Sequence, residues 1–290
     1  MPASSPQPAA RGSIFMENLG LQFGRGSRTV RTLQSIDLNI KPGEFVCVIG
    51  PSGCGKSTLL GAVAGFIPVS EGRLLVDREK VMGPGADRGM VFQHHTLFPW
   101  KTIASNVEFG LKMRGMPQAQ RREAGREFIK KVGLAGFERH YPAQLSGGMQ
   151  QRVGLARVLI NQPRVLLMDE PFGALDAQTR IMMQELLLEI WNEIRTTVIF
   201  VTHDIDEAIF LADRIVVMTC RPATVKAQID IKIRRPRTLD DVTTPEFSRI
   251  KRDCMALVRE ESLRAINGPK LGRGDLLDAA LESGAKMGLA

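Results

Sequence analysis

Long apolar runs are missing from this sequence of 290 residues. Runs such as VLLM at 165–168 and VIFV at 198–201 have the size of buried strands, whereas an α-helix needs about 20 apolar residues to cross a bilayer. The first dozen residues, MPASSPQPAARG, lack the apolar stretch of a secretory signal, so residues 1–12 are expected to form a flexible leader. These absences predict a chain that is soluble by itself.

Cysteine is also scarce, and its spacing excludes the usual metal-binding pattern. The four cysteines, at positions 47, 54, 220 and 254, include no C-x-x-C pair, which favours reduced thiols in a reducing compartment over a disulfide framework. The net charge of +8 is compatible with nucleic acid, an anionic membrane surface or polyphosphate as a ligand. The basic cluster KIRRPR at 232–237 is interpreted as solvated surface.

What the sequence does contain is an alternation of apolar strands and helices. Four short runs are typical of strands buried on both faces: 45–50, 165–170, 197–203 and 214–218. After Asp176, apolar residues recur at a spacing of three and four along 183–194, which indicates the core face of a helix. This alternation predicts an α/β fold with a mostly parallel sheet, in which ligands collect at the carboxyl ends of the strands.

The pattern also divides the chain. Residues from about 94 to 160 break the strand rhythm and are predicted to form a helical subdomain inserted in a domain of residues 13–240. Residues 241–290 are weakly patterned and are expected to form a C-terminal helical extension. No second phosphate loop exists, which predicts one nucleotide-binding domain per chain.

The stretch GPSGCGKST at 50–58 fits the pattern G-x-x-x-x-G-K-[ST] between a strand and a helix. Backbone N–H groups of such a loop turn inward around phosphate, and the amino end of the helix adds favourable partial charge. Lys56 is expected to bridge the β- and γ-phosphates, and Ser57 to offer its hydroxyl to Mg²⁺. The alternative is a plain glycine-rich turn. The predicted binding residues are Gly50, Pro51, Ser52, Gly53, Cys54, Gly55, Lys56, Ser57 and Thr58.

Two carboxylates directly follow the apolar strand in LLMDEP at 166–171. Such a pair is costly unless a cation faces it, so Asp169 is the candidate for holding Mg²⁺ and Glu170 for polarising the attacking water. An acidic helix cap beyond the strand is the alternative.

Three further side chains are candidates. Gln93, after GMVF, is expected to reach both metal and water, although a lone glutamine is usually a surface amide. His203 closes TVIFVTH, where an imidazole donor stabilises charge on the γ-phosphate, the alternative being a structural histidine. Phe23 lies upstream of the loop, where its ring either stacks on adenine or belongs to the core.

A second serine-glycine turn, LSGGMQQR at 145–152, completes a set of motifs whose order and spacing resemble the ATP-binding subunits of ABC transporters. The set includes the phosphate loop, VFQ, LLMDEP, GALD at 173–176 and VTHD at 201–204, and the resemblance covers about residues 14–225. LSGGMQQR is its most specific part. The resemblance implies a phosphate-loop NTPase core, an antiparallel β subdomain on the N-terminal side and hydrolysis of ATP with Mg²⁺.

In this family two subunits meet head to tail, and the second turn of one closes over the ATP held by the other. Ser146 and the N–H groups of Gly147 and Gly148 precede a predicted helix, so they form an anion-binding end that suits this role. The resemblance implies that Asp176 communicates between the two sites across the interface. The alternative for Asp176 is an N-cap of the next helix.

Finer features, at 96–111, 171–180 and 206–218, resemble the importer ATPases for nitrate, sulfonate, taurine and related small anions or organic solutes. That subgroup works on the cytoplasmic face of the bacterial inner membrane with two membrane-spanning permease subunits, fed by a periplasmic binding protein. Phe98, Pro99 and Trp100 lie where the family docks a short permease helix, and a satellite core cluster is the alternative. Two departures are Phe23 in place of tyrosine and CRPATV at 220–225, which lacks the usual glycine after Arg-Pro.

Rival hypotheses remain at this point. An ABC-type ATPase acting on ribosomes or DNA would use the positive charge as a nucleic-acid footprint, but such proteins usually carry two nucleotide domains or long insertions, so no nucleic-acid partner is expected. A small-molecule phosphotransferase would use the same phosphate loop, and LSGGMQQR argues against it. The third rival is the ATPase of an exporter.

Overall fold

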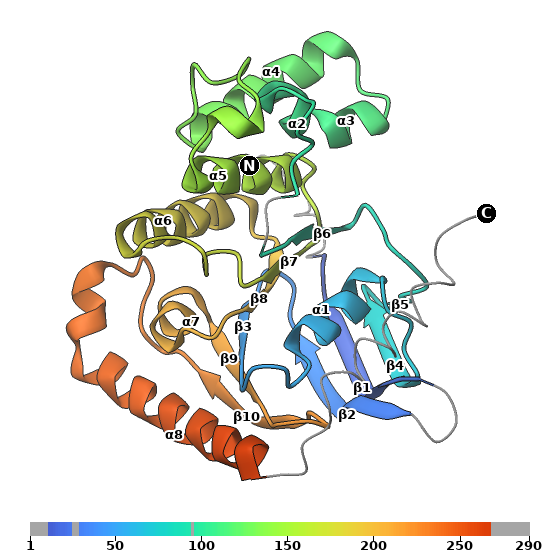
Figure 1. Ribbon diagram of the computed structural model, residues 1–290, viewed down its shortest axis with the longest axis vertical. Coiled ribbons are helices and arrows are strands. Elements are labelled where there is room, and N and C mark those ends of the chain that lie inside the picture. The colour runs from blue at the N-terminus through green and yellow to red at the C-terminus, as the bar shows by residue number, and fades with distance from the viewer. Residues whose placement is uncertain (1–10, 25–28, 94–95, 268–290) are drawn as a thin grey trace, which may run out of the picture.

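Two β-sheets of different type form the centre of the structure, a computed structural model that describes residues 11–24, 29–93 and 96–267 (Figure 1). The larger sheet is mostly parallel, because β10 alone among its strands runs antiparallel to its neighbour. Its strands, in spatial order, are β10 (Val225–Asp230), β9 (Arg214–Met218), β3 (Phe45–Ile49), β8 (Thr197–Val201), β7 (Val165–Asp169) and β6 (Arg88–Val91).

The second sheet is antiparallel, as the family resemblance implied. Its spatial order is β2 (Val30–Ile40), β1 (Ile14–Phe23), β4 (Glu71–Val76) and β5 (Glu79–Lys80). Along β2, buried and exposed residues largely alternate, so one face of the strand packs inward and the other meets solvent.

The parallel sheet is a central layer that is buried on both faces. In β3, Phe45, Cys47 and Ile49 belong to one apolar cluster, while Val46 and Val48 belong to the other. The first cluster includes residues of the helical region and of the helices after β7, and the second includes α1 (Lys56–Ala64) and the antiparallel sheet. This two-sided burial explains why the central strands are continuously apolar instead of alternating.

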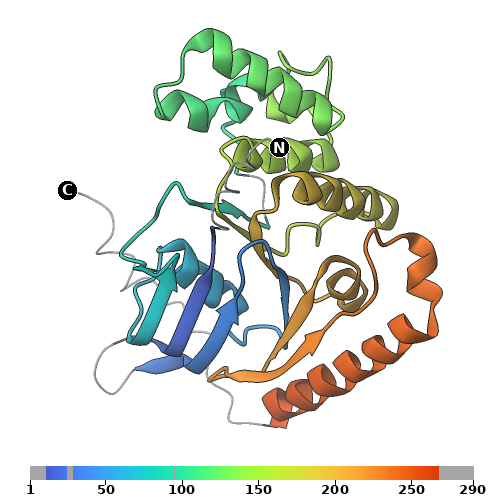
Figure 2. The same ribbon diagram turned by 180° about the vertical axis from the view of Figure 1, so that it is seen from behind.

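Four helices gather at one end of the molecule, where both views show them apart from the antiparallel sheet (Figures 1 and 2). They are α2 (Ile103–Val107), α3 (Phe109–Met113), α4 (Gln118–Lys131) and α5 (Gly147–Leu159), with the 3₁₀ helix η2 (Pro142–Gln144) before α5. All four lie inside the segment predicted to be a helical subdomain, of which residues 94 and 95 are outside the described ranges. The division of the chain into domains stays a prediction.

The remaining helices follow the parallel strands. Helix α6 (Ala177–Ile194) buries Met183, Leu187, Ile190 and Trp191, the stripe expected from their spacing. Helix α7 (Ile205–Leu211) lies between β8 and β9 in the chain, and after η3 (Leu239–Thr243) the long α8 (Pro245–Asn267) packs against α7 and β9. Residues 268–290 of the predicted extension lie outside the described ranges. Within those ranges, no helix combines the length and apolar character needed to span a membrane.

The predicted fold class is confirmed, and all four predicted strands are present within one or two residues of their expected ends. Two strands of the parallel sheet, β6 and β10, were not predicted. Most of their residues are only partly buried, because each lies at an edge of the sheet, and so neither contains a continuous apolar run.

Candidate functional site

The glycine-rich loop lies at the carboxyl end of β3 and leads directly into α1, which begins at Lys56. The N-cap residue Gly55 offers no side-chain bond, so the first N–H groups of α1 are free of a side-chain cap and can bind an anion. At Gly55 (φ +123°) a Cβ would lie 2.9 Å from Leu33 Cδ2 and 3.0 Å from Thr32 Cγ2. Glycine is therefore required here by both the backbone conformation and the close approach of β2.

The side chain of Lys56 is buried and folds back over the loop. Its Nζ donates to the carbonyl oxygens of Gly50, at 2.9 Å, and Pro51, at 3.0 Å. Within the loop, Pro51 and Cys54 are buried, whereas Ser52 and Gly53 are exposed. A phosphate bound by the loop would thus meet both N–H donors and a positive charge.

Ser57 and Asp169 are brought into contact from positions far apart in the chain. Ser57 Oγ, in the first turn of α1, donates to Asp169 Oδ1 at the end of β7, at 3.0 Å. Burial raises the pKa of Asp169, and so does the charge of Glu170, whereas the bond from Ser57 and the charge of Lys56 act in the opposite direction. A hydroxyl and a carboxylate side by side are the oxygen donors that Mg²⁺ prefers, so these residues fit the predicted metal.

Glu170 and His203 form the next pair along this edge. Glu170 adopts a left-handed conformation (φ +45°), and its N–H donates to the Val201 carbonyl at 2.9 Å. His203 Nδ1 lies 3.2 Å from Glu170 Oε2. Neither Asp169 nor Glu170 caps a helix, since α6 begins later with Asp176 as its N-cap, so the helix-cap alternative is not observed.

Gln93 joins the same group. Both Gln93 Nε2 and His203 Cε1 lie within 4 Å of the point that a Cβ on Gly173 would occupy, at 3.9 and 3.8 Å, and the carbonyl oxygen of Glu170 lies at 3.5 Å. Gln93, Glu170 and His203 therefore lie close together in the fold, although their chemical roles remain predictions.

The second serine-glycine turn begins α5, as predicted. Ser146 is the N-cap, and its hydroxyl accepts from the Met149 N–H at 3.4 Å. Ser146 and Gly147 are exposed, while Gly148 is half-buried against Thr179. Within the described part of the chain, the hydrogen bonds of Ser146 stay inside its own helix, so its outward face is available to another molecule.

Asp176 and Phe23 have less specific surroundings. Asp176 caps α6 by accepting from the Thr179 N–H at 3.0 Å, and hydrogen bonds from Thr179 lower the pKa of this carboxyl. The N-cap alternative is thus observed, and a role across an interface stays a prediction. Phe23 ends β1 opposite Val30 and is partly exposed, which leaves its stacking on adenine equally a prediction.

Two side chains that the sequence analysis did not single out form hydrogen bonds between separate segments of the site. The buried Gln151 donates from Nε2 to the Pro171 carbonyl, which links α5 to the segment that carries Glu170. Arg180 donates to the Leu175 carbonyl at 2.9 Å and to Asp204 Oδ2 at 3.3 Å. Both residues lie within quoted motifs, yet the motifs do not indicate which loops they join.

An apolar groove of about 630 Å³ lies between the helical region and β6. Phe98 and Phe109 line it with ring centroids 4.7 Å apart, and Trp100, 5.8 Å from Phe98, is 72% exposed. A satellite core cluster explains the packing of Phe98 against Phe109, but it does not explain the exposure of Trp100.

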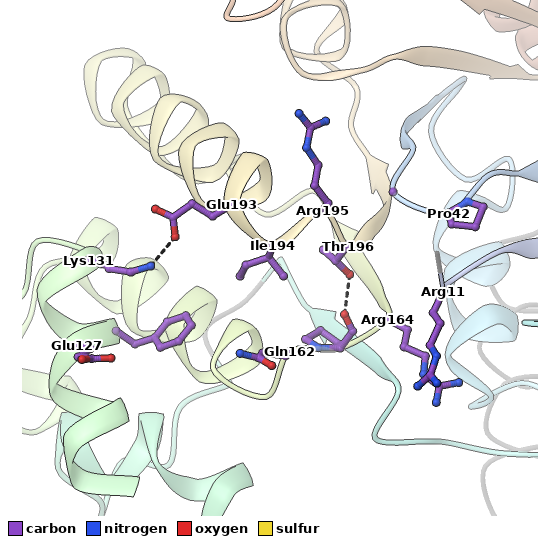
Figure 3. Close-up of a pocket in the computed structure, with 13 residues that line it drawn as sticks. Arg11, Pro42, Glu127, Lys131, Gln162, Arg164, Glu193, Ile194, Arg195 and Thr196 are labelled. Carbon is purple, nitrogen blue, oxygen red and sulfur yellow. Dashed lines mark hydrogen bonds and ion pairs between the residues drawn. The ribbon is translucent and has the colours of Figure 1, made fainter. Parts of the chain in front are cut away.

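A second cavity, of about 1000 Å³, is shown in Figure 3. Its lining includes the residues that precede β3, β7 and β8, among them Gly43, Arg164 and Thr196, so it lies at the amino edge of the parallel sheet. The ion pair between Lys131 of α4 and Glu193 of α6 crosses it (Figure 3). This cavity is on the opposite edge from the phosphate loop and plays no part in that site.

The loop before α1, the Ser57–Asp169 contact and the Glu170–His203 pair together define a phosphate-loop NTPase core. Two further features are typical of one group of phosphate-loop NTPases, the ATP-binding cassettes. They are the helical region with Ser146 at the start of a helix, and the antiparallel sheet beside the core.

Comparisons with known proteins agree with the assignment to the ATP-binding cassettes. A family model described as ABC transporter matches residues 33–173. The chain is 46% identical to the nitrate import ATP-binding protein NrtD of Synechocystis sp., over 81% of this chain and 90% of the relative. It is 45% identical to the taurine import ATP-binding protein TauB of Rhizobium johnstonii, over 83% and 94%.

Among solved structures, a dimeric ATP-binding cassette in a post-hydrolysis state, bound to ADP and Pi, is similar with a TM-score of 0.67 and 34% identity. The match covers 76% of this chain and 99% of that cassette. The chain belongs to the ABC transporter family of ATP-binding proteins, and it is an ATPase of that family.

Proposed function

We propose that this protein is the ATP-hydrolysing subunit of an ABC importer that takes up a small anion or organic solute of the nitrate, sulfonate or taurine kind. It works as a homodimer on two membrane-spanning permease subunits, at the cytoplasmic face of a bacterial inner membrane, with a periplasmic binding protein delivering the solute. The importer names of the nitrate and taurine relatives support this proposal over an exporter or a nucleic-acid ATPase.

In the proposed reaction the phosphate loop holds ATP. Lys56 binds the β- and γ-phosphates, and the N–H groups at the start of α1 bind the phosphate oxygens. Ser57, Asp169 and Gln93 would hold Mg²⁺, which when bound neutralises charge on the phosphates.

Water attack is assigned to the pair beside the metal site. Glu170 is held by its backbone bond to Val201 and by His203, so its carboxylate can accept a proton from the attacking water. His203 can also donate to the γ-phosphate and stabilise the charge that develops there.

The main observation in support of the proposed homodimer is the exposed start of α5. Ser146 and Gly147 face outward, and the hydrogen bonds of Ser146 stay within α5. Helix starts with free N–H groups bind phosphate, so a γ-phosphate held by the loop of one subunit can be closed over by Ser146 of the other. Hydrolysis cleaves the shared γ-phosphate from ADP, and release of that phosphate then weakens the dimer. The dimeric state of the similar solved cassette supports this arrangement.

The groove around Phe98 and Trp100 is the proposed docking place for a short helix of each permease subunit. An exposed tryptophan beside a partly filled apolar groove is the kind of anchor that a helix-in-groove contact uses.

Co-purification tests the importer hypothesis. We expect neighbouring reading frames to encode a multi-span permease and a secreted binding protein, and the tagged permease to retain this chain. Trp100→Ala should reduce retention at least about 10-fold, as loss of an interface hot spot does. Tyr141→Ala, which removes another exposed aromatic of the helical region, should not reduce it. Solute uptake into vesicles that requires the binding protein is the expected activity, whereas outward transport would identify an exporter.

A further inference from the structure

The turn between β9 and β10 lies beside the phosphate loop. Strands β3 and β9 are parallel neighbours with Ile49 opposite Val217, so the segments that follow them leave the sheet at the same edge. At Gly50, the first residue of the loop, a Cβ would come within 2.9 Å of the Met218 carbonyl oxygen. Residues 219–224, called here the β9–β10 turn, are therefore in position to contact the loop.

Arg221 makes that contact. Its Nη2 donates to the Gly53 carbonyl oxygen at 2.5 Å, and its Nε is buried. Burial raises the pKa of Cys54, while the charges of Lys56 and Arg221 act in the opposite direction, as expected for a guanidinium close to that thiol.

The carbonyl that accepts from Arg221 belongs to the peptide between Gly53 and Cys54, and no packing surrounds Gly53. Gly53 is exposed with φ +72°, and nothing lies within 4 Å of the point that a Cβ would occupy. The Gly53 carbonyl and the Cys54 N–H belong to one planar peptide and point in opposite directions. The Cys54 N–H also donates to the Pro51 carbonyl at 3.4 Å, so the bond from Arg221 holds this peptide from its other side and reinforces its orientation in the middle of the phosphate loop.

The turn is anchored on one side by β2. The Ala223 N–H donates to the Thr32 carbonyl, and the Gln34 N–H donates to the Ala223 carbonyl, both at 2.9 Å. Because Thr32 also lies against Gly55, one strand contacts both the turn and the end of the loop.

On its other side the turn is anchored by α8. Glu261 is fully buried, and its Oε2 accepts from the Cys220 N–H at 3.0 Å, one residue before Arg221. Its Oε1 accepts from Lys226 Nζ at 2.6 Å and from Arg264 Nη1 at 3.0 Å. A buried carboxylate is tolerated only when it is bonded in this way, so the contact between α8 and the turn is specific and not merely apolar packing.

We propose that Arg221 is a positioning residue of the phosphate loop, and that α8 controls the nucleotide affinity of the loop through the bond from Cys220 to Glu261. The proposal rests on the proposed role of residues 50–58 in binding ATP. It gives the C-terminal helix a physical route to the nucleotide, along which a ligand or partner that displaces α8 would weaken binding.

Nucleotide affinity and turnover, measured separately, test the role of Arg221. In Arg221→Gln, the Kd for Mg-ATP and for Mg-ADP should rise together by about 10-fold, the effect of losing roughly one charged hydrogen bond. The kcat at saturating ATP should stay within about 2-fold, because the catalytic groups are untouched. Arg221→Lys, which keeps a charged donor, should recover most of the affinity.

Arg234→Gln serves as the matched control, since it removes an exposed arginine beyond the far end of β10 and should leave both Kd values unchanged. An Arg221→Gln protein that is folded by circular dichroism and binds Mg-ATP like the native protein would overturn the proposal. A loss of kcat at unchanged Kd would overturn it as well.

A double-mutant cycle tests the part played by α8. Glu261→Met, which cannot accept from the Cys220 N–H, should raise the Kd for Mg-ATP by about 3-fold alone, but it should add nothing in the Arg221→Gln background if it acts through that residue. Glu260→Met is the control, because Glu260 also contacts Lys226 but makes no bond to Cys220. Additive effects, or no effect of Glu261→Met in a protein with a native melting profile, would reject the route through α8.

The phosphate-loop function and the positioning role of Arg221 can be contradicted separately. Unchanged affinity in Lys56→Ala would contradict the phosphate-loop function itself, whereas native affinity in Arg221→Gln with weakened binding in Lys56→Ala would contradict only the positioning role.

Discussion

Replacing Glu170 by glutamine should separate the chemistry of this site from its stability. The substitution keeps the length of the side chain, but it removes the carboxylate that accepts a proton from water. We expect Glu170→Gln to bind ATP, to hydrolyse it very slowly and to accumulate as an ATP-dependent dimer.

The contacts of Glu170 determine how much stability the substitution should cost, and its proposed role as general base determines how much activity should be lost. Its contact with His203 is at 3.2 Å, and the two side chains are 25% and 62% exposed, so losing this pair should cost no more than about 1 kcal/mol of the free energy of unfolding. The backbone bond to Val201 and the left-handed conformation do not depend on the charge. A general base contributes about 10²- to 10⁴-fold in rate, which corresponds to roughly 3–5 kcal/mol of the activation barrier.

Three measurements check this prediction: phosphate release at saturating Mg-ATP, thermal unfolding, and size-exclusion chromatography with and without ATP. Glu193→Gln is a matched control, because it also removes a carboxylate from an exposed ion pair, with Lys131, at the opposite edge of the sheet. A Glu170→Gln protein with kcat within about 10-fold of the native value would refute the assigned role. A collapse of its melting temperature would show that the loss of activity came from unfolding.

Other changes should separate binding, dimerisation and folding. Lys56→Ala should weaken binding of Mg-ATP at least about 10-fold by calorimetry, because it removes the ammonium group that lies over the loop; equal affinity would count against the assignment. Ser146→Asp should keep the helix cap but repel a γ-phosphate, so that ATP still binds to the monomer while the dimer is lost from chromatography. Arg237 is buried, contrary to the solvated surface expected for 232–237, and its guanidinium donates to three carbonyls at the end of α7. Arg237→Met should therefore lower the free energy of unfolding in urea by about 3 kcal/mol, and a change below about 1 kcal/mol would contradict this account.

Local patterns in the sequence were enough to predict the central strands and the start of α5. The continuous apolar runs of β3, β7, β8 and β9 reflect burial on both faces of the sheet, and this burial is readable without the fold. Ser146 before two glycines likewise predicted a helix N-terminus from local chemistry alone. The edge strands β6 and β10 escaped prediction because partly buried residues leave no apolar run.

The contacts that complete the site were decided by the order of strands in space. Residue 49 lies beside residue 217, and residue 48 beside residue 201, only because β9 and β8 flank β3. The spacing of apolar residues along the sequence does not indicate the order of the strands in space. The sequence therefore determined which residues are the candidates for phosphate chemistry and where along the chain they stand. Tertiary structure alone decided that Ser57 meets Asp169 and Arg221 meets Gly53, because such contacts join segments more than a hundred residues apart through the packing of the whole sheet.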